Sequence, residues 1–345
     1  MKKFIYKSSL FLLLILTTLV LVNYFGDSAR LFTKGYEEKI INIISNNKNA
    51  TNISNFDWRL LRRDYIDRLN VRPDVLVLGS SRAMLINNSY FDDKKLLNNA
   101  VTGATLQDFI AIFQIYKTKK ILPKSIIIGL DPWIFNVNNE QKRWLTLSKE
   151  YYSYYNIEKI NNEISNFYKI KELISPSYFQ ESYKNLLNKS DPISTKKIYN
   201  KTNTLLFDGS LTYGEKYRKV SQEIVDNKAV YFIEDGLYSL EKFDLISADL
   251  FDEFERFCNE IVNNKIKLSI ILVPYHPIVY NKINNNYKIV LDVENKIIEF
   301  AKNNNIKYFG SYNPENTGIS RQEFYDGMHL NESGIKIILN QSTKP

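Results

Sequence analysis

The stretch that decides the fold is "PDVLVLGSSRAMLI", residues 73–86. It begins with a short aliphatic run, stops at Gly79, and continues into residues that favour the start of a helix. An aliphatic run of this length, bounded by turn residues, predicts a strand that is buried on both faces, as in a parallel sheet. The serines and the arginine that follow Gly79 are therefore expected at the carboxyl edge of that sheet.

Further stretches along the chain carry the same signal. Residues 95–119 predict a strand, a glycine turn and a long helix from about Thr105, and strands are expected at Ser125–Gly129, at Leu268–Val273 and within residues 304–312. Aliphatic strands that alternate with helical segments indicate a parallel sheet with both faces covered. The expected fold is α/β, a flavodoxin-like three-layer α/β/α sandwich around a mainly parallel five-stranded sheet.

The N-terminus has a different composition. The basic start "MKKFIYK" precedes Ser8–Gly26, an uncharged stretch close to the ~20 residues that cross a bilayer as a helix. Large residues follow Val22 where a cleavage site needs small ones, so an uncleaved anchor in residues 1–26 is favoured over a removed signal peptide. The lysines before the apolar stretch predict a cytoplasmic N-terminus and an extracytoplasmic position for the rest of the chain.

The remaining chain is expected to have a stalk and one domain. Residues 27–70 predict a helical stalk, with an apolar side that packs on the domain and an arginine side that faces away. Residues 71–345 predict the α/β domain, interrupted after its third strand by a helical insertion at about 137–243. An insertion at that point would cover the strand ends and shape a groove for an acceptor.

Composition narrows the classes of partner. The chain has 345 residues and a net charge of +8, but its lysines are scattered and no recognition motif is present, so no nucleic acid is expected. Two histidines and one cysteine are too few for a typical zinc site, and no phosphate-binding glycine loop is present. Neither a metal nor a cofactor is therefore expected. Cys258 occupies an inward-facing helical position and predicts a core thiol.

Reactive side chains gather where the predicted strands end, the edge at which open parallel sheets place their catalytic groups. Ser81 follows the first strand on a tight turn, where its own backbone N–H can stabilise an oxyanion. A serine nucleophile needs a base, and His276 and His329 are the only histidines. Asp326 lies three residues before His329 and can orient its imidazole, whereas His276 stands between two prolines.

These blocks resemble the SGNH (GDSL-type) hydrolase superfamily, in which a serine follows the first strand, a glycine the second, and an Asp-x-x-His lies near the C-terminus. The resemblance spans residues 71 to about 338. It implies that Ser81 is the nucleophile and that Asp326 and His329 complete the triad. It also implies an oxyanion hole made by the backbone N–H groups of Ser81 and Gly103.

Two blocks depart from the pattern of that family. The first reads "GSSR" where the family has Gly-Asp-Ser, and the third reads "GLDP" where it usually has G-x-N-D. The ionised carboxylate of Asp131 cannot donate a hydrogen bond to an oxyanion, and Arg82, Asn99 or Asn136 would have to replace that donor. The candidate substrate-binding residues at the strand ends are Arg82, Asn99, Asp131, Asn136, Tyr275 and His276.

A similar "GSS" start on a membrane-anchored chain occurs in the D-alanyl-lipoteichoic acid transfer proteins and the alginate O-acetylation proteins. The resemblance implies a serine esterase or O-acyltransferase that forms an acyl-enzyme on an O-acylated envelope polysaccharide. The expected partners are that glycan, the membrane and a membrane-bound acyl donor protein. The alternatives are an inactive SGNH-fold protein that binds glycan or scaffolds a polysaccharide-modification complex, and a lipid-directed esterase with a broad apolar groove beside Ser81.

Overall fold

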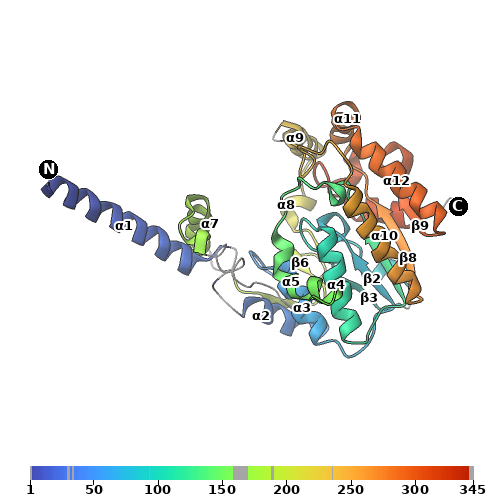
Figure 1. Cartoon of the computed structure of the whole chain (residues 1–345), viewed down its shortest axis with the longest axis horizontal. Helices are drawn as coiled ribbons and strands as arrows, with labels where there is room; N and C mark the ends of the chain where they lie inside the picture. The colour runs from blue at the N-terminus through green and yellow to red at the C-terminus, as the bar shows by residue number, and fades with distance from the viewer. Residues whose placement is uncertain are drawn as a thin grey trace.

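The structure is a computed structural model that describes residues 2–28, 32, 35–92, 94–157, 170–187, 190–234 and 236–341. An α/β body holds a five-stranded parallel sheet, and the N-terminal helix α1 (Lys2–Gly26) extends away from it (Figure 1). By length and composition, α1 is able to cross a membrane. The predicted α/β fold, its parallel sheet and the apolar N-terminal helix are confirmed at this level.

The order of the strands places a switch point at the centre of the sheet. The order is β3 (Leu96–Asn98), β2 (Val75–Leu78), β4 (Ser125–Gly129), β8 (Lys267–Leu272) and β9 (Lys307–Gly310), and neighbours are parallel. The chain moves from β2 outward to β3 and then returns to the other side of β2 to form β4. Open α/β sheets bind ligands at such a switch point, outside the carboxyl ends of the strands.

Both faces of the sheet are buried, as the aliphatic runs predict. Leu76 and Leu78 of β2 belong to one hydrophobic cluster, and Val75 and Val77 belong to another. Successive side chains of a strand point to opposite faces, so each face of the sheet has its own core. The first cluster includes side chains of α4 (Leu106–Thr118), α10 (Ala248–Asn263) and α12 (Ile289–Asn303), and the second includes those of α13 (Glu332–Leu339). Cys258 is fully buried in the first, which confirms the predicted core thiol.

The segment that precedes the domain is more than a helical stalk. It contains α2 (Tyr36–Ile44), β1 (Asn49–Thr51) and α3 (Trp58–Asp67). These elements share a hydrophobic cluster with Leu97 of the central sheet, so they pack directly on the body. The expectation that the arginines of α3 face away is wrong for Arg59 and Arg62, which are only 2% and 0% exposed, whereas the side chain of Arg63 is 33% exposed. The guanidinium groups of Arg59 and Arg62 bond to the loops that follow β3 instead.

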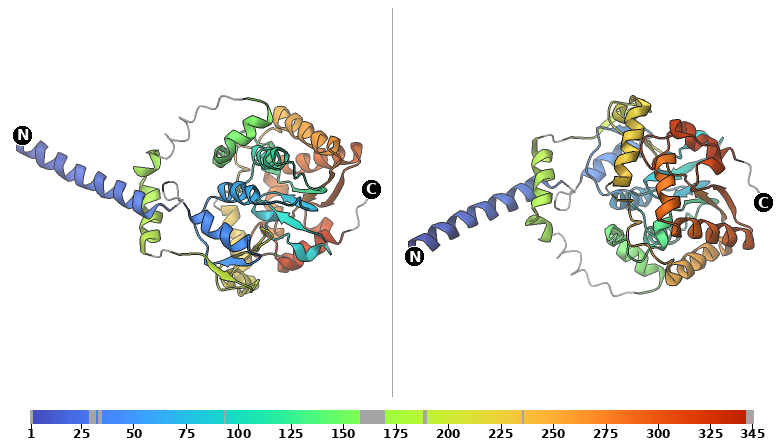
Figure 2. Two further views of the ribbon diagram at one scale, coloured as in Figure 1. Left: turned by 90° about the horizontal axis from the view of Figure 1, so that it is seen from below. Right: turned by 90° about the horizontal axis from the view of Figure 1, so that it is seen from above.

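The insertion at about 137–243 contains strands as well as helices. β5 (Ile193–Thr195), β6 (Thr204–Leu205) and β7 (Leu211–Thr212) form an antiparallel sheet with β1, in the order β5-β1-β6-β7. Its described helices include α5 (Ser148–Tyr154), α7 (Pro176–Leu187), α8 (Glu215–Arg218) and α9 (Gln222–Glu234). α7 packs on α1, away from the body, whereas α9 packs on α11 (Pro277–Asn286) (Figures 1 and 2). One insertion therefore reaches both the anchor and the domain.

Candidate active site

Ser81 lies directly after the carboxyl end of β2. Gly79 allows the turn, because a Cβ atom there would lie 2.7 Å from the Cβ of Ala83. Ser80 caps the next residues by accepting a hydrogen bond from the N–H of Arg82 at 3.2 Å. The sequence predicts that a helix begins here, and the structure has a single 3-10 turn, η1 (Ser81–Ala83), in its place. The turn leaves Ser81 partly exposed between buried neighbours.

The loop before α13 brings an imidazole and a carboxylate to Ser81. The Oγ of Ser81 lies 2.9 Å from Nε2 of His329. The Nδ1 of His329 lies 3.0 and 2.9 Å from the two carboxylate oxygens of Asp326. One of these oxygens also accepts the backbone N–H groups of Met328 and His329, each at 2.9 Å. The three side chains that the sequence singles out thus form one chain of hydrogen bonds, in the order hydroxyl, imidazole and carboxylate, an order that is able to activate a serine.

The pKa of Asp326 fits this arrangement. Burial alone would raise it, but the imidazole of His329 and the backbone N–H groups stabilise the carboxylate and lower the pKa to about 2. Asp326 is therefore ionised at neutral pH. A fixed negative charge at Nδ1 stabilises the imidazolium that forms when Nε2 accepts a proton.

The backbone holds the Asp-x-x-His loop in shape. The N–H of Tyr325 donates to the carbonyl of His329 at 2.8 Å, which closes the loop on itself. Asn331 then caps α13 by accepting the N–H of Gly334 at 3.1 Å. Because both ends of the loop are fixed in this way, the positions of Asp326 and His329 do not depend on the side-chain contacts alone.

Gly103 lies in the turn after β3, with a φ of +55° in the left-handed region. A Cβ atom on Gly103 would lie only 2.3 Å from the hydroxyl oxygen of Tyr238, so a larger residue would displace that side chain and would also be strained at this φ. Arg59 donates to the carbonyls of Thr102 and Gly103 at 3.2 and 3.3 Å. Within the described part of the chain, neither the N–H of Ser81 nor that of Gly103 donates to a protein acceptor. Both groups are therefore available to a ligand.

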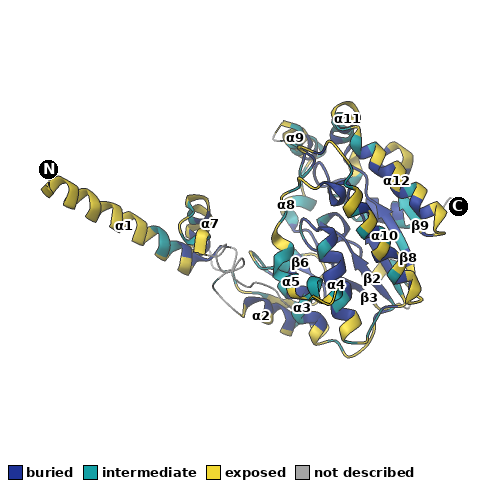
Figure 3. Cartoon of the chain, in the orientation of Figure 1, coloured by how far each residue is buried: buried dark blue, intermediate teal, exposed yellow. Residues whose placement is uncertain are grey.

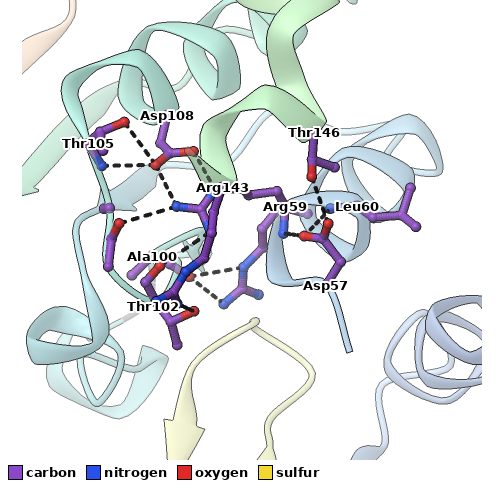
Figure 4. Close-up of polar contacts among 12 residues, drawn as sticks. Asp57, Arg59, Leu60, Ala100, Thr102, Thr105, Asp108, Arg143 and Thr146 are labelled. Atoms are coloured by element: carbon purple, nitrogen blue, oxygen red, sulfur yellow. Dashed lines mark hydrogen bonds and ion pairs between the residues drawn. The ribbon is translucent and has the colours of Figure 1, made fainter. Parts of the chain in front are cut away.

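A buried ion pair supports the Gly103 turn from α3 (Figure 4). Arg59 donates to the two carboxylate oxygens of Asp108 at 2.6 and 2.7 Å, and the side chains are 2% and 0% exposed. Burial opposes the charge on Arg59, but Asp108 more than offsets it, so the pKa of Arg59 is raised. Asp108 also accepts the N–H of Thr105 at 2.9 Å, where α4 begins. This pair thus fixes the start of α4 and the turn before it.

The insertion joins the same polar network. Asp57 caps α3 by accepting the N–H of Arg59 at 2.8 Å, and it accepts the hydroxyl of Thr146 at 2.8 Å (Figure 4). Thr146 belongs to η4 (Arg143–Leu147), and Arg143 lies 3.4 Å from the hydroxyl of Thr102. The N-terminal segment, the Gly103 turn and the insertion are therefore held together by hydrogen bonds.

Asp131, in the third of the sequence blocks, is paired with Arg82 of the first block. Arg82 donates to Asp131 at 2.8 Å, and the two side chains are 1% and 3% exposed. Burial raises the pKa of Asp131, and Arg82 only partly offsets this. A buried carboxylate of this kind is tolerated because its partner is adjacent. Asp131 of "GLDP" and Arg82 of "GSSR" thus form one buried ion pair.

Arg82 holds together the loops around Ser81. Its guanidinium donates to the carbonyls of Met328 at 3.1 Å, of Pro274 at 2.9 Å, and of Val273. It also lies 4.0 Å from the ring centre of Tyr275. These contacts join the ends of β2, β4 and β8 to the loop that carries His329. Arg82 is therefore placed as a support for the site, and its donors are directed to protein acceptors.

The other sequence-predicted contacts are also buried. The amide of Asn99 donates to the hydroxyl of Tyr116 at 2.6 Å, and the amide of Asn136 donates to the carbonyl of Ser239 at 2.9 Å. Asn99, Asn136 and Tyr275 are each 2% exposed or less. The structure does not bring their polar groups to the surface beside Ser81. The sequence offers Arg82, Asn99 and Asn136 as oxyanion donors, and all three donate to protein acceptors instead.

His276 occupies a structural position. It is fully buried and caps α11, because its Nδ1 accepts the N–H of Ile278 at 3.3 Å. Its Nε2 lies 3.3 Å from a carboxylate oxygen of Asp226 in α9, in a contact too poorly aligned to count as a hydrogen bond. Burial lowers the pKa of His276, and Asp226 only partly offsets this. Its backbone N–H also donates to Gly327 at 3.1 Å, so it supports the loop of Asp326.

A cleft of about 590 Å³ adjoins Asp326. The insertion supplies its other lining residues, which are Tyr217, Ile224, Asn227, Lys228, Tyr231 and Phe232. The ammonium group of Lys228 lies 4.9 Å from the ring centre of Tyr217. A Cβ atom on Gly327 would lie 2.8 Å from Phe232, so α9 packs closely on the loop between Asp326 and His329. The insertion thus forms a wall beside the triad.

The structure brings together a subset of the sequence-predicted residues and adds others. Ser81, Asp326 and His329 are in contact, whereas the sequence gives no sign of the nearby roles of Arg59 and Tyr238. The spacing of Thr-x-x-Asp before α4 is the one local signal that indicates Asp108, because it is that of a capping box. No protein-family model matches the chain, and no curated protein matches it.

Proposed function

We propose that this protein is a membrane-anchored serine enzyme that transfers or hydrolyses an O-linked acyl group on a cell-envelope polymer. The observation that carries the proposal is the hydrogen-bonded chain from Ser81 through His329 to Asp326. A buried, ionised carboxylate that orients a partly exposed imidazole onto a partly exposed hydroxyl is the arrangement that activates a serine. The proposed family is the SGNH (GDSL-type) hydrolases, which the order of the sequence blocks resembles.

The proposed reaction has two steps. In the first, Nε2 of His329 accepts the proton of Ser81 as Oγ attacks the ester carbonyl, and the N–H groups of Ser81 and Gly103 bind the oxyanion. The bond to the leaving alcohol then breaks, and that alcohol takes the proton from His329. In the second step, a water or a sugar hydroxyl gives its proton to His329 and attacks the acyl group. Ser81 leaves and recovers the proton.

Tyr238 is the side chain that we assign as the further oxyanion donor. The carboxylate of Asp131, which stands at the family's position for this donor, is paired with Arg82. The hydroxyl of Tyr238 contacts Gly103 closely and is able to donate a hydrogen bond. Because Tyr238 belongs to the insertion, stabilisation of the oxyanion would then depend on the position of the segment that also lines the cleft.

The cleft offers aromatic and polar side chains to which a glycan can bind. Tyr231 exposes 63% of its surface, and Asn227 and Lys228 place polar groups beside it. Aromatic faces stack on sugar rings, while amide and ammonium groups bond to hydroxyl or anionic substituents. Apolar and aromatic side chains, among them Ile224 and Phe232, line the same cleft, so a comparison of glycan and lipid esters as substrates is needed to separate the two classes.

The N-terminal helix supports a site outside the cytoplasm. The apolar window of α1 is not buried against the rest of the protein, as expected of a helix that lies in lipid. The lysines at positions 2, 3 and 7 favour a cytoplasmic N-terminus. A membrane-bound acyl donor is the partner that a site outside the cytoplasm favours.

The flavodoxin-like three-layer arrangement of the domain also belongs to the proposal, and the strand order supports it.

The second candidate function is binding of a glycan without catalysis. The observation that favours it is the ion pair of Asp131 with Arg82, which replaces the family's usual oxyanion donor.

Both candidates can be tested with the full chain in detergent, an O-acetylated polysaccharide and 4-nitrophenyl acetate, with and without a sugar acceptor. We expect an acetyl group on Ser81 and its release to water or to the sugar. The Ser81→Ala variant should lose both, and the Ser89→Ala variant, which changes an exposed serine, should keep both. Glycan binding without acetyl-enzyme or turnover would favour the second candidate.

A further inference from the structure

The end of α1 is held by the insertion. α7 lies across the C-terminal end of α1, next to the point where the chain leaves that helix (Figure 2). A Cβ atom on Gly26 would lie 2.2 Å from the carbonyl oxygen of Ser182, so the two backbones are in direct contact. Small residues at a helix crossing allow such an approach.

Hydrogen bonds fix this crossing. The amide of Asn23 donates to the carbonyls of Glu172, Leu173 and Ser175 at 3.1, 2.9 and 3.1 Å. In the other direction, the amide of Asn185 donates to the carbonyl of Gly26 at 2.5 Å. Polar groups without partners are costly in hydrocarbon, so these contacts mark the level at which the apolar part of α1 ends.

α7 has three distinct faces. Tyr178, Ser182 and Asn185 recur at helical spacing and are buried against the end of α1. A polar stripe carries Gln180, Glu181 and Lys184. Between these two faces runs an apolar stripe, which consists of Phe179, Tyr183, Leu186 and Leu187. Its last three members are 51%, 39% and 66% exposed, although side chains of this size are normally covered.

Exposed aromatic side chains also lie at the end of α1, next to α7 in the chain's fold. Tyr24 and Phe25, at the end of α1, are 49% and 62% exposed. The rings of Phe179 and Tyr183 stack with centres 6.3 Å apart. Aromatic residues collect at the level of the lipid headgroups, where one side of the ring is apolar and the other is wet. If α1 spans a membrane, its C-terminal end and the adjoining α7 lie at the surface of that membrane.

We propose that α7 lies in the plane of the membrane interface and inserts its apolar stripe among the lipids of the leaflet in which α1 ends. Amphipathic helices bind membranes in this way, with lysines such as Lys184 close to anionic headgroups. The contacts between α1 and α7 then fix the angle at which α1 leaves the membrane. This inference requires that α1 spans a bilayer, and it is independent of the chemistry at Ser81.

The test uses the full chain in vesicles of phosphatidylethanolamine and phosphatidylglycerol, with a fluorescent label on single introduced cysteines. Leu187→Cys and Tyr183→Cys place the label on the apolar stripe, Lys184→Cys on the polar face of the same helix, and Leu245→Cys on the body, at a residue that is 76% exposed. Leu13→Cys reports whether α1 is inserted. Cys258 is fully buried, and labelling of the parent chain measures its background.

Lipids that carry the nitroxide on the acyl chain should quench the labels at positions 183 and 187 roughly threefold more than the labels at position 184, which lies at the headgroups, and position 245. Equal quenching at 187 and 245, while the label at 13 is quenched, would overturn the proposal. Protection of 187 from water without quenching by lipid would also overturn it, because a protein would then cover the stripe. The paired labels on one helix make the comparison valid even where a single substitution disturbs α7.

Discussion

The carboxyl edge of the sheet buries charged side chains, whereas the α1–α7 pair exposes apolar ones. Charged side chains are usually exposed and apolar side chains are usually buried. At the edge, the charged side chains of Arg59, Asp108, Arg82 and Asp131 are 3% exposed or less. Along α1 and α7, apolar side chains face outward (Figure 3). Buried charge persists where it is paired, and an exposed apolar stripe persists where something other than water covers it. We infer that the first region is built for a reaction and the second for a membrane.

The largest expected effect separates the two histidines at the edge. His329→Gln should lower kcat for an activated acetyl ester by about 10⁴-fold, because the proton of Ser81 then has no acceptor. His276→Asn keeps an acceptor that can cap α11, so it should retain turnover and lower the thermal midpoint instead. Steady-state kinetics and thermal unfolding of the same preparations measure both. Comparable losses of kcat in the two variants would contradict the assignment of His329 as the base and of His276 as a structural residue.

The next effect concerns the cost of unpairing a buried charge. Arg59→Ala leaves Asp108 buried without its partner and should destabilise the protein by about 3–5 kcal/mol. Lys219→Ala removes an exposed ion pair with Glu215 and should leave the urea midpoint unchanged. Arg59→Lys keeps the charge but not the forked contacts, so it should lower kcat more than it raises KM. A stable Arg59→Ala chain with full kcat would show that the Gly103 turn needs no such support.

A smaller effect distinguishes two carboxylates of the same edge by pH. The folded-state pKa of Asp326 is about 2, below its ordinary value of 3.8, so its contribution is complete above pH 3.8 and is lost as pH falls through 2. That contribution is about 2 kcal/mol. Asp131 acts in the opposite sense: its pKa is raised, so ionisation costs stability as pH rises above 3.8. Asp326→Asn should flatten the stability curve between pH 4 and 2, and an unchanged slope there would contradict the assignment.

The smallest effect lies in the α1–α7 pair. Leu187→Ser removes an exposed leucine and should change the free energy of unfolding in detergent by less than about 0.5 kcal/mol. Leu76→Ala, in the core of the sheet, should cost about 2–5 kcal/mol under the same conditions. Chemical unfolding of both variants makes the comparison. A loss at position 187 as large as that at position 76 would mean that the stripe is part of a protein core.

The sequence predicts what depends on neighbours along the chain. The strands, the turn at Gly79 and the Asp326–His329 pair follow from local patterns, and the structure contains each of them. The sequence cannot indicate that Arg59 meets Asp108 or that Asp226 lies beside His276, because distant segments make those contacts. The burial of Arg59 also contradicts the helical pattern, in which arginines usually face water. Local sequence patterns therefore fail to predict the ion pairs that join distant segments around the site.

The most direct test of the central claim is whether Ser81 is activated. The full chain in detergent is treated with a fluorophosphonate, and intact mass and peptide mapping locate any adduct, with Ser81→Ala and His329→Ala treated in parallel. The hydrogen-bonded chain from Ser81 to Asp326 predicts a single adduct on Ser81 that is absent from both variants. A folded parent chain that forms no adduct, or that carries it on another residue, would contradict the claim.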